Sequence, residues 1–176
     1  MNINTVEPYV QGNLDGLCGL YSVVNAVKLI RRKTPAKAIF KESLRFLSEN
    51  HNLAEIVGAG MERPILSKLL NLAAKRVPVS SKWPFYRGKS PSLASFWSVL
   101  EGHVNEQEGR TAIVAFSCAS WSHWSVVREV KEERLVLFDS DGRKQLVRSL
   151  CTTNQPTKAR PMMIEAATVC LLSVAG

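Results

Sequence analysis

The spacing of apolar residues changes once along this chain, near Val77, and that change limits the folds open to it. Before this point apolar residues recur every three or four positions, which is typical of amphipathic helices. After it they gather in short runs rich in β-branched residues, which is typical of strands. Helices first and strands afterwards predict an α+β fold with an antiparallel sheet, since a doubly wound sheet would need the two to alternate.

Three helices are expected in the first part of the chain. The first begins just after Asp15 and Gly16, and a cluster of three cations closes it. The second has Pro35 at its first helical position, where the missing N–H group of proline does no harm. Gly58 and Gly60 mark the turn before the third. The expected ranges are 17–32, 35–50 and 61–75.

The second part of the chain is expected to be mostly strands. Prolines and a glycine interrupt the chain between residues 78 and 91, around one short strand, and a short helix follows near residues 93–100. The segments KEE and DSDG are typical of hairpin connections. No internal repeat or domain boundary is visible, so residues 1–176 are expected to form one domain. Further strands are expected at 111–116, 124–130, 134–138, 145–148 and 162–174.

Composition excludes several classes of protein. A chain of 176 residues that is 45% hydrophobic and 22% charged can bury about 70% of its unfolded surface, which argues against a disordered or fibrous chain. No window reaches the roughly 18 consecutive apolar residues that a membrane span needs. The four cysteines form no CxxC pair and no metal-ligand spacing. We therefore expect reduced thiols, no metal site and no cofactor.

The chain is basic, with 23 Lys and Arg against 15 Asp and Glu and a formal charge of +8. This balance favours encounter with acidic partners. The basic residues are scattered and not interleaved with aromatics, so a solvated surface is a better interpretation than sequence-specific nucleic-acid binding. The N-terminus lacks the basic and apolar regions of a secretory signal. We expect a cytoplasmic product, or one secreted by a signal-independent route.

Cys18 stands at the expected start of the first helix. There the positive end of the helix dipole and nearby unpaired N–H groups favour a thiolate over a thiol, so Cys18 is a candidate nucleophile. The alternative interpretation is a small core residue on an amphipathic helix. The remaining cysteines fall in or beside expected strands and are expected to be buried small hydrophobes; they are Cys118, Cys151 and Cys170.

His123 stands just before an expected central strand, and Asp139 ends the next strand. Two antiparallel strands joined by a short turn bring the start of one beside the end of the other, so Asp139 is expected within reach of His123. This would be a general base with its orienting acid, although a strand-capping histidine and a turn-forming aspartate are the alternatives. Asp141 is the competing orienter. The other histidines, His51 and His103, are expected to be solvated.

These residues resemble the papain-like cysteine peptidases, in the style of the bacterial double-glycine (bacteriocin-processing) peptidases. The resemblance rests on Gln11 upstream of Cys18-Gly19, on His123-Trp124 before a β-branched run, and on Asp139 after the next strand. It covers residues 11–142. The chain order Cys, His, Asp is that of papain.

The resemblance implies a papain-like fold, with the N-terminal helices packed on the sheet, and a role for each residue. Cys18 would attack a carbonyl, and His123 would protonate the leaving amine with Asp139 fixing its tautomer. Gln11 would bind the oxyanion, although its separation of seven residues from Cys18 is one more than the usual six. Asn13 or a backbone N–H group could share that role. No metal is implied.

The resemblance also suggests a substrate. Trp121 and Trp124 flank the histidine and could wall a narrow cleft, which would favour small residues such as Gly-Gly before the cut, although tryptophans near a sheet are often core residues. A transglutaminase- or deamidase-type toxin using the same triad is an alternative, because an amine as well as water can resolve a thioester. A non-enzymatic basic binding module is another.

Compact stand-alone domains of this kind also resemble papain-like effector toxins that bacteria deliver into competitors and that come with an immunity protein. The resemblance therefore implies a protein substrate and an acidic immunity or inhibitor protein as partners. The charge of +8 would speed association with such an inhibitor, or with a DNA-associated target such as a type II topoisomerase.

Overall fold

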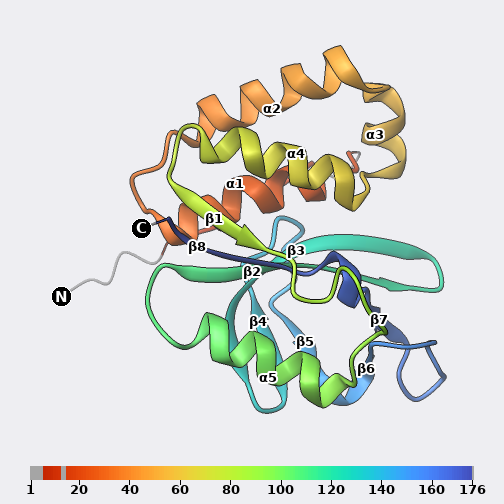
Figure 1. The fold of residues 1–176 in the computed structure, drawn as a ribbon. Helices are drawn as coiled ribbons and strands as arrows, with labels where there is room; N and C mark the ends of the chain where they lie inside the picture. The colour runs from red at the N-terminus through yellow and green to blue at the C-terminus, as the bar shows by residue number, and fades with distance from the viewer. Residues whose placement is uncertain (1–5, 13–14, 176) are drawn as a thin grey trace.

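The fold is known from a computed structural model that describes residues 6–12 and 15–175. Its elements form three layers, with four helices on one face of a sheet and a fifth helix on the other (Figure 1). This confirms the α+β expectation. No helix within those residues is long and apolar enough to cross a membrane. The helices are α1 Cys18–Ile30, α2 Ala36–Asn50, α3 Leu53–Ala59, α4 Arg63–Ala74 and α5 Leu93–Val104.

The sheet has the strand order β1-β8-β2-β3-β4-β5 and is antiparallel along this path. A short strand, β7, pairs with β2 next to the start of β8 and joins β6 in a parallel pair. The strands are β1 Val79–Lys82, β2 Arg110–Cys118, β3 Trp121–Lys131, β4 Arg134–Leu137, β5 Gln145–Val147, β6 Cys151–Thr152, β7 Met162–Ile164 and β8 Cys170–Val174.

Helix α1 lies between the sheet and the other helices of the same face, against β3 and β2 on one side and α4 and α2 on the other (Figure 1). Leu20, Val23 and Val27 have no exposed surface. Valine is not a strong helix former, and burial of this apolar helix outweighs that preference. The position of α1 is therefore determined by packing on both of its faces.

The sheet is apolar on both faces, which explains the unbroken apolar run of β2. Ile113 and Ala115 belong to the core under α1, whereas Val114 and Phe116 belong to the core under α5. A strand covered on both faces needs apolar residues at every position. The two cores meet at β2 and β3, the two longest strands.

Helix α3 was not expected, because the glycines at 58 and 60 indicate a turn. In the structure Gly58 lies inside α3, and Gly60 ends the helix with a φ of 86°. The side chain of Asn52 accepts a hydrogen bond from the backbone N–H of Glu55 and caps the helix. An Asn followed by a Glu three residues later is a helix-start signal that the sequence does contain.

The single C-terminal strand expected at 162–174 is wrong. It is divided into β7 and β8 by a short 3-10 turn at Ala166–Thr168. Both strands pair with the same edge of β2, β7 near its end at Phe116 and β8 near its start. A continuous apolar run does not indicate which part of a partner strand each residue pairs with. The division into two strands therefore could not be predicted from the sequence. It places Glu165 at the bend.

Asn25 is fully buried in the middle of α1 and ties the N-terminal segment to that helix. Its side-chain oxygen accepts the backbone N–H of Tyr9 at 2.8 Å, and its side-chain nitrogen donates to the carbonyl of Tyr9 at 2.9 Å. A buried amide is tolerated only when its polar atoms find partners. The two bonds therefore determine where the segment that contains Gln11 runs.

Replacing Asn25 with Ala should lower the free energy of unfolding by about 1–3 kcal/mol, because both hydrogen bonds are lost at a buried position. Chemical denaturation with CD detection measures this. Asn71, which is exposed on α4, is the matched control, and Asn71→Ala should change stability by less than about 0.5 kcal/mol. Equal effects of the two substitutions would contradict the role given to Asn25.

Candidate active site

Cys18 is the first residue of α1 and is buried. The side chain of the N-cap residue, Leu17, makes no capping hydrogen bond to this helix. The carboxylate of Asp15 accepts the backbone N–H of Leu17 at 3.1 Å and that of Gly12 at 2.8 Å. The first N–H groups of a helix have no partner within the helix. The N–H of Cys18 thus lies at the positive end of the α1 dipole.

Two glycines let the start of α1 pack directly on the α3–α4 connection. A Cβ atom on Gly16 would lie 2.8 Å from the carbonyl oxygen of Val57, to which Gly16 donates its N–H at 2.6 Å. A Cβ atom on Gly19 would lie 2.7 Å from Cγ of Met61. Because of this close approach, the α3–α4 connection forms a wall beside Cys18.

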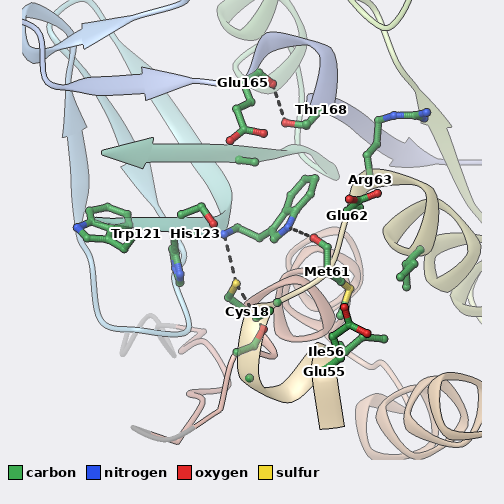
Figure 2. Close-up of a pocket in the computed structure, with 18 of the residues that line it drawn as sticks. Cys18, Glu55, Ile56, Met61, Glu62, Arg63, Trp121, His123, Glu165 and Thr168 are labelled. Carbon is green, nitrogen blue, oxygen red and sulfur yellow. Dashed lines mark hydrogen bonds between the residues drawn. The ribbon is translucent and has the colours of Figure 1, made fainter. Parts of the chain in front are cut away.

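The sulfur of Cys18 rests against strand β3. The backbone N–H of Trp124 donates to Sγ with an N–S distance of 3.5 Å, and the indole Nε1 of Trp124 donates to the carbonyl of Met61 at 2.9 Å (Figure 2). Trp124 therefore links the helix start, the strand and the α3–α4 wall. The residue before it in β3 is His123.

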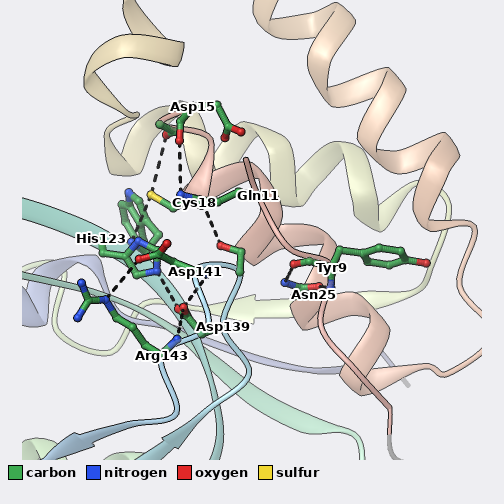
Figure 3. A network of polar contacts seen from close by, with 12 residues as sticks. Tyr9, Gln11, Asp15, Cys18, Asn25, His123, Asp139, Asp141 and Arg143 are labelled. Carbon is green, nitrogen blue, oxygen red and sulfur yellow. Dashed lines mark hydrogen bonds and ion pairs between the residues drawn. The ribbon is translucent and has the colours of Figure 1, made fainter. Parts of the chain in front are cut away.

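His123 lies inside β3, not just before it, because β3 already begins at Trp121. It pairs with Phe116 of β2, and the two rings meet edge to face at 5.6 Å between centroids. Its Nε2 atom is 2.8 Å from Oδ2 of Asp139 (Figure 3). The side chains of His123 and Asp139 are 6% and 0% exposed. The hairpin of β3 and β4 thus brings the two predicted partners together.

The carboxylate of Asp139 is held at both oxygens. Oδ1 accepts the backbone N–H groups of Asp141 at 2.8 Å and of Arg143 at 3.1 Å, while Oδ2 faces His123. Asp141, the competing orienter, is exposed and forms an ion pair with Arg143 at 3.7 Å. Asp139 is therefore the acid that orients His123.

Burial and charge act in opposite directions on this pair. Burial alone would lower the pKa of His123, but hydrogen bonds with Asp139 and with Cys18 outweigh it and raise the pKa to about 9. Burial would raise the pKa of Asp139, and the hydrogen bond with His123 outweighs it and lowers that pKa. At neutral pH the pair is an imidazolium and a carboxylate, with Cys18 beside the cation.

Gln11 is held by Ser140, the residue after Asp139. The backbone N–H of Gln11 donates to the carbonyl of Ser140 at 3.0 Å, and the hydroxyl of Ser140 donates to Oε1 of Gln11 at 3.1 Å (Figure 3). Nε2 of Gln11 donates to the carbonyl of Asp15 at 3.4 Å, toward the start of α1. Since Oε1 is occupied, the donor end of the amide is directed to the Cys18 side. Asn13, the other candidate, lies outside the described residues.

Ser140 is a site residue that the sequence did not indicate. It is 3% exposed, and the turn DSDG shows only that the chain reverses there. Its contact with Gln11 joins residues 129 positions apart. No local pattern reports such a contact.

Cys18 and His123 line a cavity of about 950 Å³ together with both predicted tryptophans, Trp121 and Trp124 (Figure 2). One wall comes from α3 and the start of α4, and the other from the β2–β3 hairpin and the bend after β7. Within residues 6–12 and 15–175, no group of three or more His, Cys, Asp or Glu side chains could hold a metal ion.

Three secondary expectations are corrected. His103 is not solvated, because its Nε2 lies 3.0 Å from the carbonyl of Leu172. His51 is half-buried against Phe46 and lines the cavity. Cys118 is half-buried, not buried, and hydrogen bonding at Ser120 lowers its pKa. The remaining two cysteines are buried, which raises the pKa of Cys151 to about 11 and that of Cys170 to about 12.

Comparison with models of known protein families and with curated protein sequences finds no match for this chain.

Replacing Asp139 with Asn should lower the pKa of His123 from about 9 toward its ordinary value of about 6.5, because the carboxylate of Asp139 then no longer opposes burial and only the interaction with Cys18 is left. NMR titration of the histidine ring protons measures this, with His51 and His103 as internal controls. An unchanged pKa would contradict the assignment of Asp139.

The same substitution changes how stability depends on pH. In wild type the folded protein keeps a proton on His123 that the unfolded chain releases, so the free energy of unfolding should fall as pH rises from about 6.5 to about 9. This part of the pH dependence should be smaller in Asp139→Asn.

Proposed function

We propose that this chain is a papain-like cysteine peptidase that cleaves a protein substrate with Cys18 as the nucleophile. The observation that supports this most strongly is the buried pair of His123 and Asp139, whose histidine lines one cavity together with Cys18. If Cys18 were only a core residue, His123 only a strand residue and Asp139 only a turn residue, none of the three would need to lie beside the others. The meeting of Cys18 and His123 at one cavity, with Asp139 behind the histidine, favours a shared chemical role.

In the first half of the reaction Cys18, as a thiolate beside the imidazolium of His123, attacks the carbonyl carbon of the scissile peptide bond. A C–S bond forms, and the carbonyl electron pair moves to oxygen. The N–H of Cys18 and Nε2 of Gln11 bind the oxyanion. The oxyanion then collapses, the C–N bond breaks, and His123 gives its proton to the leaving amine, which leaves a thioester.

In the second half His123, now neutral, takes a proton from water. The hydroxide attacks the thioester, and Cys18 leaves as a thiolate beside the restored imidazolium. Asp139 occupies Nε2 of His123, so Nδ1 is the ring nitrogen that serves Cys18 and the substrate. Asp139 therefore acts through orientation and charge.

Hydrolysis and transfer to an amine share every step up to the thioester. Mass spectrometry of a proteome treated with the protein separates them, because a peptidase creates new termini whereas a transglutaminase or deamidase changes the mass of glutamine. Cleavage after Gly-Gly, a role as an antibacterial effector, an immunity protein and a DNA-associated target stay predictions.

Cys18→Ala should lower kcat by about 10⁶, and His123→Ala should be nearly as damaging, while the double variant should be little worse than either, because the residues act as one unit. The formation of new termini in a treated proteome measures this. Cys118→Ser is the matched control and should keep wild-type activity. Residual activity of Cys18→Ala above about a tenth of wild type would overturn the proposal.

Gln11→Ala should lower kcat by about 10²- to 10³-fold, the usual cost of losing one oxyanion donor. Ser140→Ala should have a smaller effect on kcat, with little change in KM, and no effect when Gln11 is already Ala, because Ser140 acts through Gln11. Ser81→Ala, on the exposed side of β1, is the control. A full Ser140→Ala effect in the Gln11→Ala background would show that Ser140 acts elsewhere.

A further inference from the structure

The cavity beside Cys18 is acidic, although the whole chain is basic. Three glutamates line it: Glu55 from α3, Glu62 at the start of α4, and Glu165 at the bend after β7. Glu55 and Glu62 are exposed, and Glu165 is half-buried. Two stand on the helical wall and the third on the sheet wall, so negative charge borders the cavity from both sides (Figure 2).

These three carboxylates have no cationic partner among the described residues, where the ion pairs within 4.0 Å involve other acids. No lysine is among the described lining residues, and besides the imidazolium of His123, which is paired with Asp139, Arg63 is their one cation. Its guanidinium lies 3.6 Å from the ring centroid of Tyr86, and its side chain extends away from Cys18 and His123 (Figure 2). The carboxylates are thus left for a ligand.

Between the carboxylates the cavity offers apolar surface. Met61, Ile65 and Trp124 line it and are buried or half-buried. Lysine and arginine side chains pack their methylene stems along apolar surface and keep the charged end near water or a counter-charge. A concave site with an excess of one sign of charge also concentrates ligands of the opposite sign.

We infer that this cavity binds a peptide segment that carries lysine or arginine close to the bond that Cys18 attacks. The inference rests on the proposed function, since it takes Cys18 as the attacking group. The three carboxylates alone would be no site; they form one here because the cavity opens on Cys18 and His123. The net charge of the chain favours acidic partners elsewhere on the surface, whereas the substrate meets a local field of opposite sign.

A binding experiment on the Cys18→Ala variant tests this without turnover. Three fluorescent peptides of one Gly- and Ala-rich sequence carry Lys, norleucine or Glu at two positions, and anisotropy gives their Kd at low and high salt. We expect the Lys peptide to bind about tenfold tighter than the norleucine peptide, and this advantage to shrink with salt. Equal affinity of the Lys and norleucine peptides would overturn the inference.

Charge-removing variants locate the effect. In the Cys18→Ala background, Glu62→Gln and Glu165→Gln should each weaken binding of the Lys peptide by about two- to fivefold and leave the norleucine peptide unchanged. The triple variant that adds Glu55→Gln should lose the preference. Glu101→Gln, exposed on α5 across the sheet, is the control. A triple variant that keeps the preference would place the basic residue elsewhere.

Cleavage of the same peptides by wild type separates this inference from the proposed function. A preference for binding the Lys peptide without cleavage of any peptide would support the acidic cavity and contradict the peptidase. Equal affinities with cleavage of all three peptides would support the peptidase and contradict the basic substrate.

Discussion

The buried ion pair of His123 and Asp139 is the interaction on which the rest of the site depends. Two charges removed from water carry a desolvation cost that their attraction does not always offset. Here the carboxylate receives two backbone N–H groups as well as the imidazolium, so its oxygens are satisfied. The turn after β4 exists in this shape because it closes around Asp139. That turn also places Ser140, and through it Gln11, on the same side as Cys18.

Three distant parts of the chain meet at this point. The N-terminal segment brings Gln11, the first helix brings Cys18, and the β3–β4 hairpin brings the ion pair. Polar contacts hold these parts in place. Asn25 binds the backbone of the N-terminal segment, and the N–H of Trp124 contacts the sulfur of Cys18. The apolar cores supply most of the stability, while these few polar contacts determine relative position.

The order of helices and strands could be predicted because each hydrophobic period reports on one kind of element. Contact of His123 with Asp139 was predictable for a related reason, since a hairpin is local in sequence. The bend at Glu165 and the contact of Gln11 with Ser140 could not be predicted, because they depend on contacts between segments that lie far apart in the sequence. The charge of the cavity could not be predicted either. The net charge sums over the whole chain, in which the three glutamates that line the cavity are a minority of the charged residues.

The proposed nucleophile and its proposed base belong to different layers of the molecule. Cys18 starts a helix of the upper layer, whereas His123 and Asp139 belong to the sheet (Figure 1). The distance between sulfur and imidazole therefore measures how closely the two layers are docked. The close approach at Gly16 and Gly19 joins the start of α1 to the α3–α4 wall within the upper layer. A molecule that wedged the α3–α4 wall away from β3 would separate the two groups without touching either of them.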